Sequence, residues 1–91
     1  MAYPYFASLF ETMNLIDFVS LSFDEQLLTL EHAELKHSFS LDGSEFYLYQ
    51  VNDFFVEVKR KLPDLHFEKM NTMYFEDLPQ EYKLIVSPES R

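Results

Sequence analysis

The chain has 91 residues, a formal net charge of −9, no cysteine and a single glycine. The absence of cysteine excludes disulfides, thiolate nucleophiles and cysteine-based metal sites, and one glycine is too few for the glycine-rich phosphate loops of nucleotide-binding domains. A chain this short buries only about 60 to 65% of its unfolded surface. We therefore expect one cytoplasmic domain, residues 1–91, with a small core of aromatic residues, which make up 18% of the sequence.

The negative charge is unevenly distributed. Residues 1–35 contain six acidic residues and no Lys or Arg, whereas residues 36–91 contain ten acidic and seven basic residues. Such a chain repels nucleic acids and membrane surfaces on average and attracts basic proteins, although acidity can also serve solubility alone. The sequence has no stretch of about 20 apolar residues, and its start lacks the basic residues of a signal peptide. We expect neither a nucleic-acid nor a membrane partner.

Two readings of the N-terminal region remain open. Apolar residues at helical spacing predict a helix over residues 5–16, with a stripe made of Phe6, Leu9, Phe10, Met13 and Ile16. Alternatively, Asn14 caps a turn over residues 15–21 with Asp17 at its third position, and residues 1–12 form an arm.

A capping box gives the clearest helix start. Ser22 and Glu25 have the spacing in which each side chain accepts a hydrogen bond from the other residue's backbone N–H. We predict a helix over residues 23–33. Its buried face is expected to contain Phe23, Leu27, Leu28 and Leu30, and its exposed face Gln26, Thr29 and Glu31.

The hydrophobic period then changes from about 3.6 to 2, which indicates strands. We predict four strands, over residues 35–41, 45–51, 54–60 and 65–74. The turns between them are expected at Asp42-Gly43, Asn52-Asp53 and Pro63-Asp64, all of which carry residue types that favour turns. In the first strand, one face is expected to contain Leu35, His37, Phe39 and Leu41.

A two-residue turn at Asn52-Asp53 fixes the pairing of the central strands. The pairs expected on one face are Val51 with Phe54, Tyr49 with Val56 and Tyr47 with Val58, and those on the other are Gln50 with Phe55, Leu48 with Glu57 and Phe46 with Lys59. The second face thus keeps three large apolar residues, and Phe39 is added beside Phe46 by the first hairpin. Either helices cover both faces or Phe46, Leu48 and Phe55 form an interface with a protein partner or a second copy of the chain.

A short C-terminal helix completes the prediction. Asp77 is expected to be its N-cap, Pro79 is compatible with its first turn and Pro88 ends it. Its apolar residues are Leu78, Tyr82 and Ile85. The predicted fold class is α+β, with one or more N-terminal helices packed on a four-stranded antiparallel meander and a short C-terminal helix.

The segments "SFDEQLLTLEHAE" and "FYLYQVNDFFVEV" resemble a group of short uncharacterised bacterial proteins from Bacteroidetes and cyanobacteria. In that group a helix ending in EHG precedes a hairpin of the type LYxLGDFFVEVYYD. The resemblance covers about residues 20–60 and departs at Ala33, Asn52 and the basic run Lys59-Arg60-Lys61. It implies the fold and no mechanism.

No residue pattern predicts catalysis, a cofactor or a metal site. His32, His37 and His66 lack the i, i+4 spacing of helical metal pairs, and Glu57 is a lone carboxylate in an apolar strand. Tyr47, Tyr49 and Phe55 near the basic run resemble the stacking platform of RNA-binding sheets, but the expected pairing divides them between two faces.

We therefore expect a non-enzymatic module for protein interaction or structure, acting through a protein partner or as a homodimer. The alternative is an acidic inhibitor of a basic partner, such as an immunity protein, an antitoxin or a DNA mimic, for which charge would steer association.

Overall fold

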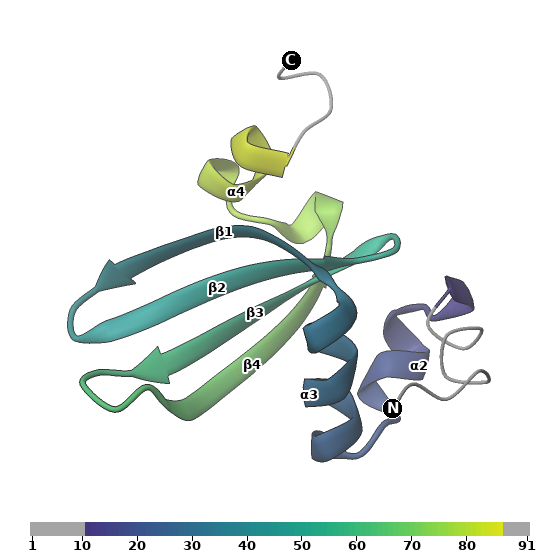
Figure 1. The fold of residues 1–91 in the computed structure, drawn as a ribbon. Coiled ribbons are helices and arrows are strands. Elements are labelled where there is room, and N and C mark those ends of the chain that lie inside the picture. The colour runs from purple at the N-terminus through teal and green to yellow at the C-terminus, as the bar shows by residue number, and fades with distance from the viewer. Residues whose placement is uncertain (1–10, 87–91) are drawn as a thin grey trace.

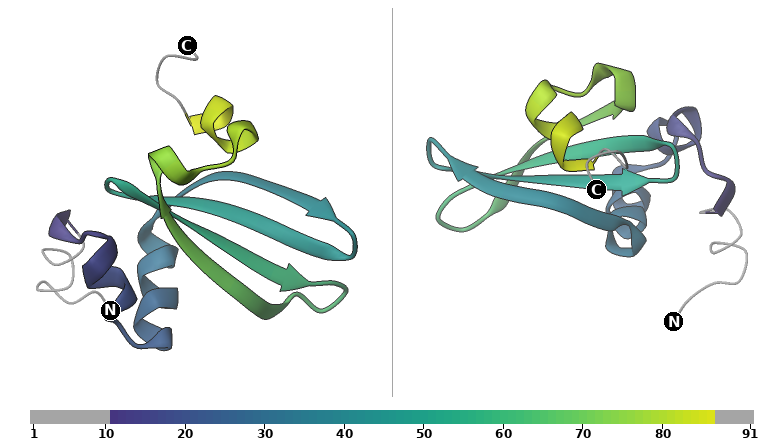
Figure 2. Two further views of the ribbon diagram at one scale, coloured as in Figure 1. Left: turned by 180° about the vertical axis from the view of Figure 1, so that it is seen from behind. Right: turned by 90° about the horizontal axis from the view of Figure 1, so that it is seen from above.

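The computed structural model describes residues 11–86. The helical elements are α2 (Leu15–Val19), α3 (Phe23–His32), the 3-10 helix η1 (Phe75–Asp77) and α4 (Gln80–Val86), and the strands are β1 (Glu34–Leu41), β2 (Ser44–Val51), β3 (Phe54–Lys61) and β4 (His66–Tyr74). The α2 and α3 helices lie on one side of the sheet, and η1 and α4 lie on the other (Figures 1 and 2). The predicted α+β architecture is confirmed.

The four strands form an antiparallel meander in the order β1-β2-β3-β4. Every β2–β3 pair expected from the two-residue turn is present, from Val51 opposite Phe54 to Phe46 opposite Lys59. The turn residues Asp42, Gly43 and Asn52 have φ of 53°, 78° and 54°. These residue types tolerate the left-handed region better than most, which explains why two-residue hairpins form at these positions.

The first sheet face carries the larger core. Val51, Phe54, Val56 and Val58 are buried against Met13, Phe18 and Leu30. The rings of Phe18 and Phe54 lie 5.6 Å apart and tilted, an arrangement favoured by aromatic quadrupoles. This face is therefore covered by the N-terminal segment, α2 and α3.

The second sheet face carries a separate, smaller core. Leu48 and Phe55 are buried against Leu78 and Tyr82, with Phe39, Met73 and Val86 at the margin. The C-terminal segment thus covers this face, which answers the question of whether helices of the same chain cover both faces.

The α2 helix begins at Asn14, not upstream. Asn14 is extended at φ −112° and ψ 179°, and its side chain forms a capping box with Asp17. The prediction of an unbroken helix through Ile16 is therefore wrong within the described residues, because Asn14 interrupts it; residues 11 and 12 are helical before the break. The part of both readings that concerns residues 1–10 lies outside the described residues.

The α3 helix has the predicted capping box at Ser22 and Glu25, but it is buried on a wider arc than predicted. Thr29 is fully buried and its hydroxyl donates to the Glu25 carbonyl at 2.9 Å, whereas Phe23 is 45% exposed. The Gln26 side chain donates to the Phe18 carbonyl at 3.0 Å. The side of α3 that carries Gln26 and Thr29, which was expected to be exposed, is therefore partly or fully buried, and Gln26 contacts α2.

A β-bulge in β1 corrects the expected face of Leu35, whereas His37, Phe39 and Leu41 lie on the expected face. Leu35 pairs with Tyr49, but His37 pairs with Leu48, so Lys36 is the extra residue. The bulge shifts the alternation by one residue. Leu35 therefore lies on the first face, while His37 and the alternating residues after it lie on the second.

The C-terminal helix differs from its prediction at its start. Asp77 ends η1 rather than capping α4, which begins at Gln80. Leu78 and Tyr82 are buried as expected, but Ile85 is 40% exposed. Pro88 lies outside the described residues.

Candidate functional site

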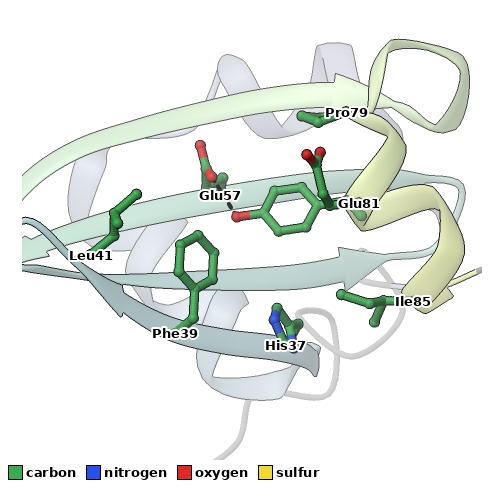
Figure 3. A pocket seen from close by; sticks show the side chains of 8 residues that line it. His37, Phe39, Leu41, Glu57, Pro79, Glu81 and Ile85 are labelled. Atoms are coloured by element: carbon green, nitrogen blue, oxygen red, sulfur yellow. Dashed lines mark hydrogen bonds between the residues drawn. The ribbon is translucent and has the colours of Figure 1, made fainter.

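A pocket of about 430 Å³ lies where α4 crosses the second sheet face. Its lining comes from β1, from the middle of β3, and from α4 with the loop before it (Figure 3). The lining residues are His37, Phe39, Leu41, Glu57, Pro79, Glu81, Tyr82 and Ile85. Most of this surface is apolar, and its polar groups are an imidazole, a phenol and two carboxylates.

The β1 wall follows from the pairing set by the Asp42-Gly43 hairpin. Three alternating residues of β1, His37, Phe39 and Leu41, all point to the second face, and the bulge at Lys36 ends this row by sending Leu35 to the first face. The rings of His37 and Phe39 are 5.7 Å apart, and Phe39 stacks on Phe46 of β2 at 5.0 Å. Leu41 is 55% exposed at the end of this wall.

The floor of the pocket is a hydrogen-bonded pair. The Tyr82 hydroxyl donates to Glu57 Oε2 at 2.6 Å, joining α4 to β3 (Figure 3). Burial raises the pKa of the Tyr82 phenol well above its usual range, and the hydrogen bond to the Glu57 carboxylate and its negative charge add to the effect. The Tyr82 hydroxyl is therefore a neutral hydrogen-bond donor at physiological pH.

Neither carboxylate of the pocket has an ion-pair partner among residues 11–86. The ion pairs in this region join Lys36 to Glu34, Lys59 to Glu68 and His66 to Asp64. Glu57 and Glu81 therefore give the pocket negative charge that no described cation offsets.

Two of the three residues predicted as a possible interface, Leu48 and Phe55, are buried, and the third, Phe46, is half-buried. Leu48 is fully buried and Phe55 is 4% exposed, because Leu78 and Tyr82 pack on them. They cannot offer a contact surface in this conformation. Phe46 remains half-buried, stacked on Phe39 and with the Lys59 ammonium 5.8 Å from its ring centre.

The three histidines are not brought together. His37 lines the pocket, His32 is exposed at the end of α3, and His66 lies in an exposed pair with Asp64 at 2.7 Å. Hydrogen bonds from the side chain and backbone of His66 lower the pKa of Asp64. Among the described residues no group of three or more His, Asp or Glu side chains could hold a metal ion.

The aromatic residues that resembled a stacking platform divide between the faces. Tyr47 and Tyr49 pack at the margin of the first core, whereas Phe55 lies in the second. Arg60 pairs with Phe67 and donates to the Leu65 carbonyl. Tyr47, Tyr49 and Phe55 therefore do not form one aromatic platform.

No helix within residues 11–86 has the length and apolar character that crossing a bilayer requires.

Sequence reasoning missed the α4 side of the pocket. Glu57 and His37 were considered individually, but their shared location with Tyr82, Pro79 and Glu81 was not predicted. Tyr82 and Glu57 are 25 positions apart, and no local pattern indicates where a terminal helix will dock. The amphipathic spacing of Leu78 and Tyr82 was the available signal, because it showed that this helix needs an apolar surface to cover.

No protein-family model matches this chain, and comparisons with curated proteins and with solved structures likewise give no match. The resemblance to short bacterial proteins therefore remains a prediction.

Proposed function

We propose that the protein is a non-enzymatic interaction module that binds a protein partner through the surface around its pocket. We call this surface the pocket face and define it by Phe39, Leu41, Phe46 and Ile85. The observation that carries the proposal is the incomplete cover of the second sheet face: α4 buries Leu48 and Phe55 but leaves Leu41 55% and Ile85 40% exposed beside a pocket. Exposed apolar side chains grouped around a concave site are typical of contact surfaces.

The polar groups of the pocket support binding rather than catalysis. The Tyr82 hydroxyl is used in a hydrogen bond to Glu57, and its raised pKa disfavours the phenolate. The lining residues include no Ser, Thr, Cys or Lys that could serve as a covalent nucleophile. The same groups are well suited to orient a ligand in an apolar pocket.

Charge favours a basic partner over a second copy of the chain. The net charge of −9 repels a second copy, and the two unpaired carboxylates of the pocket would attract a cation. This supports a second, narrower candidate, an acidic inhibitor that occupies a basic surface of its target. Nucleic acid and anionic membranes are disfavoured as partners for the same reason, and the cysteine-free sequence is consistent with a cytoplasmic location.

The test compares two double variants, each of which replaces two exposed apolar side chains by asparagine. We expect Leu41→Asn with Ile85→Asn to reduce retention of the partner from an extract of the source cells by at least tenfold, because both exposed apolar side chains of the pocket face are removed. The control is Ile16→Asn with Val19→Asn on α2, where the side chains are 66% and 50% exposed. The readout is quantitative mass spectrometry of retained proteins, with sedimentation to detect self-association.

Equal loss in both double variants, or no loss in either, would contradict the assignment of the pocket face. Concentration-dependent dimerisation that the pocket-face variant abolishes would instead identify the partner as a second copy of the chain.

A further inference from the structure

We propose that the pocket receives the ammonium end of a lysine side chain presented by a basic partner. This inference rests on the proposed function and names the group that the pocket recognises. Three features of the lining argue for it: two carboxylates without a cation, a set of aromatic rings, and an apolar rim.

The carboxylates supply acceptors. Only Oε2 of Glu57 has a hydrogen-bond partner within residues 11–86, the Tyr82 hydroxyl. Among these residues every buried side-chain nitrogen and oxygen has a partner, so Oε1 of Glu57 must be reachable from solvent. Glu81 lies on the α4 side of the pocket, exposed in the first turn of that helix. An ammonium group entering between α4 and β3 would find a half-buried acceptor at the floor and a second negative charge at the rim.

The aromatic rings supply a second attraction to a cation. The Tyr82 ring lies 6.3 Å from that of Phe39 and 6.4 Å from that of His37. The faces of Phe and Tyr rings carry partial negative charge, and a cation near them gains energy that increases as water is removed. Carboxylates alone would also suit a metal ion, but aromatic and aliphatic walls suit an organic cation with an apolar stem.

The apolar rim suits the stem of a basic side chain, and the Glu57 carboxylate distinguishes lysine from arginine. Leu41, Pro79 and Ile85 line the pocket and would contact the four methylene groups of a lysine stem. Arginine is best recognised by a planar pair of acceptors that matches its fork of donors. Here Oε2 of Glu57 is already used by Tyr82, which leaves a single oxygen of that carboxylate and favours a point charge.

None of the described lysines of the chain itself lines the pocket. Lys36 pairs with Glu34 at 3.2 Å, and Lys59 pairs with Glu68 at 3.8 Å. Lys83 points over the Phe75 ring at 5.7 Å, and none of these lysines lines the pocket. A lysine from another molecule therefore meets no competition from these side chains.

The test is an amide NMR titration of the whole chain with acetylated, amidated pentapeptides of the form Ala-Ala-X-Ala-Ala. With X as lysine we expect saturable shifts at the lining residues, with at least tenfold higher affinity than with X as norleucine, which keeps the stem and lacks the charge. Glu57→Gln and Glu81→Gln should each weaken lysine binding by about three- to tenfold. Glu31→Gln, at an exposed position of α3, should leave it unchanged.

Equal affinity for the lysine and norleucine peptides would overturn the inference but not the proposed function, which is judged separately by the Leu41 and Ile85 variants. Equal or tighter binding with X as arginine would overturn the lysine assignment. If Glu57→Gln disturbs the fold, Glu81→Gln still tests the role of the carboxylates, because Glu81 is exposed. Lysine-peptide binding that is unaffected by Glu81→Gln would refute the role of the rim carboxylate.

Discussion

Tyr82 illustrates at the residue scale how one side chain serves both packing and the pocket. Its ring is 5% exposed within the second core, and its hydroxyl satisfies Glu57 across the boundary between α4 and β3. Without this donor, a half-buried carboxylate oxygen would lose its partner, which costs free energy. The pair therefore fixes α4 on the sheet as well as shaping the floor of the pocket.

Tyr82→Phe is expected to lower the free energy of unfolding by about 1 to 2 kcal/mol near neutral pH, because a hydrogen bond to a charged group is lost. The effect should depend on pH. Since the folded-state pKa of Tyr82 is raised, its contribution is complete below the unfolded pKa of about 10 and is lost as the pH rises above that value. The difference between the two proteins should therefore shrink from about pH 9 to about pH 11, as measured by urea unfolding.

The control for this measurement is Tyr74→Phe, at a 40% exposed position of β4. If the difference in the free energy of unfolding between wild type and Tyr82→Phe stays constant across the same pH range, ionisation of the Tyr82 phenol is not coupled to folding, which would contradict the prediction.

Asn52 has two roles, one in the hairpin turn and one in tertiary packing, and its neighbours in the sequence indicate only the first. Its φ of 54° is the turn conformation that the Asn52-Asp53 pattern predicts. Its side chain also donates to the Met13 carbonyl at 2.8 Å, a contact across 39 positions. A glycine at this position would keep the turn and lose the tie to the N-terminal segment, so asparagine here serves tertiary packing as well as the hairpin.

At the element scale, the two faces of the sheet are covered to different extents. The first face has α2, α3 and the segment around Met13, whereas the second has η1 and a seven-residue α4. An isolated helix of this length is not stable in water. The α4 helix must therefore gain its stability from the packing of its own Tyr82, and of Leu78 just before it, on Leu48 and Phe55. The pocket is the part of the second face that so short a helix leaves uncovered.

Leu78→Ala is therefore expected to lower the free energy of unfolding by about 2 to 4 kcal/mol, because it leaves a cavity where the C-terminal segment meets the sheet. Leu84→Ala removes the same atoms from a side chain that is 63% exposed, and it should change stability by less than about 0.5 kcal/mol. Urea unfolding of both variants measures the contrast. Similar values for the two would mean that α4 contributes little to the folded state.

At the scale of the whole molecule, the net charge of −9 makes the two proposed kinds of association respond oppositely to salt. Association with a basic partner relies on opposite charges and should slow as ionic strength rises. Self-association brings together two acidic surfaces and should strengthen when salt screens their repulsion. Because we propose a basic partner, we expect its association rate to fall at least tenfold between about 0.02 and 0.3 M salt.

Stopped-flow or surface-based kinetics of the partner identified by retention measures this rate, and sedimentation at the same two ionic strengths follows self-association. A chain that is monomeric at low salt, dimeric at high salt and indifferent to basic proteins would contradict the proposal.

Local patterns in the sequence were sufficient for α3, for the four strands and for the pairing of β2 with β3. The Ser22 box starts α3, and the turns at Asp42-Gly43 and Asn52-Asp53 set a parity that divides the side chains of β2 and β3 between two faces. These features depend on groups within a few residues of one another, where hydrogen bonding and steric preference leave few alternatives.

Tertiary structure decided what each face contacts. The bulge at Lys36 moved Leu35 to the first face, and the docking of α4 buried Leu48 and Phe55 while leaving Glu57 at the floor of a pocket. Both outcomes depend on packing between segments that are distant in the chain. The burial of a side chain is decided by the surface that packs against it, and the local sequence does not specify that surface. The sequence by itself therefore determined the sheet, and the contact between its second face and the last helix determined the site.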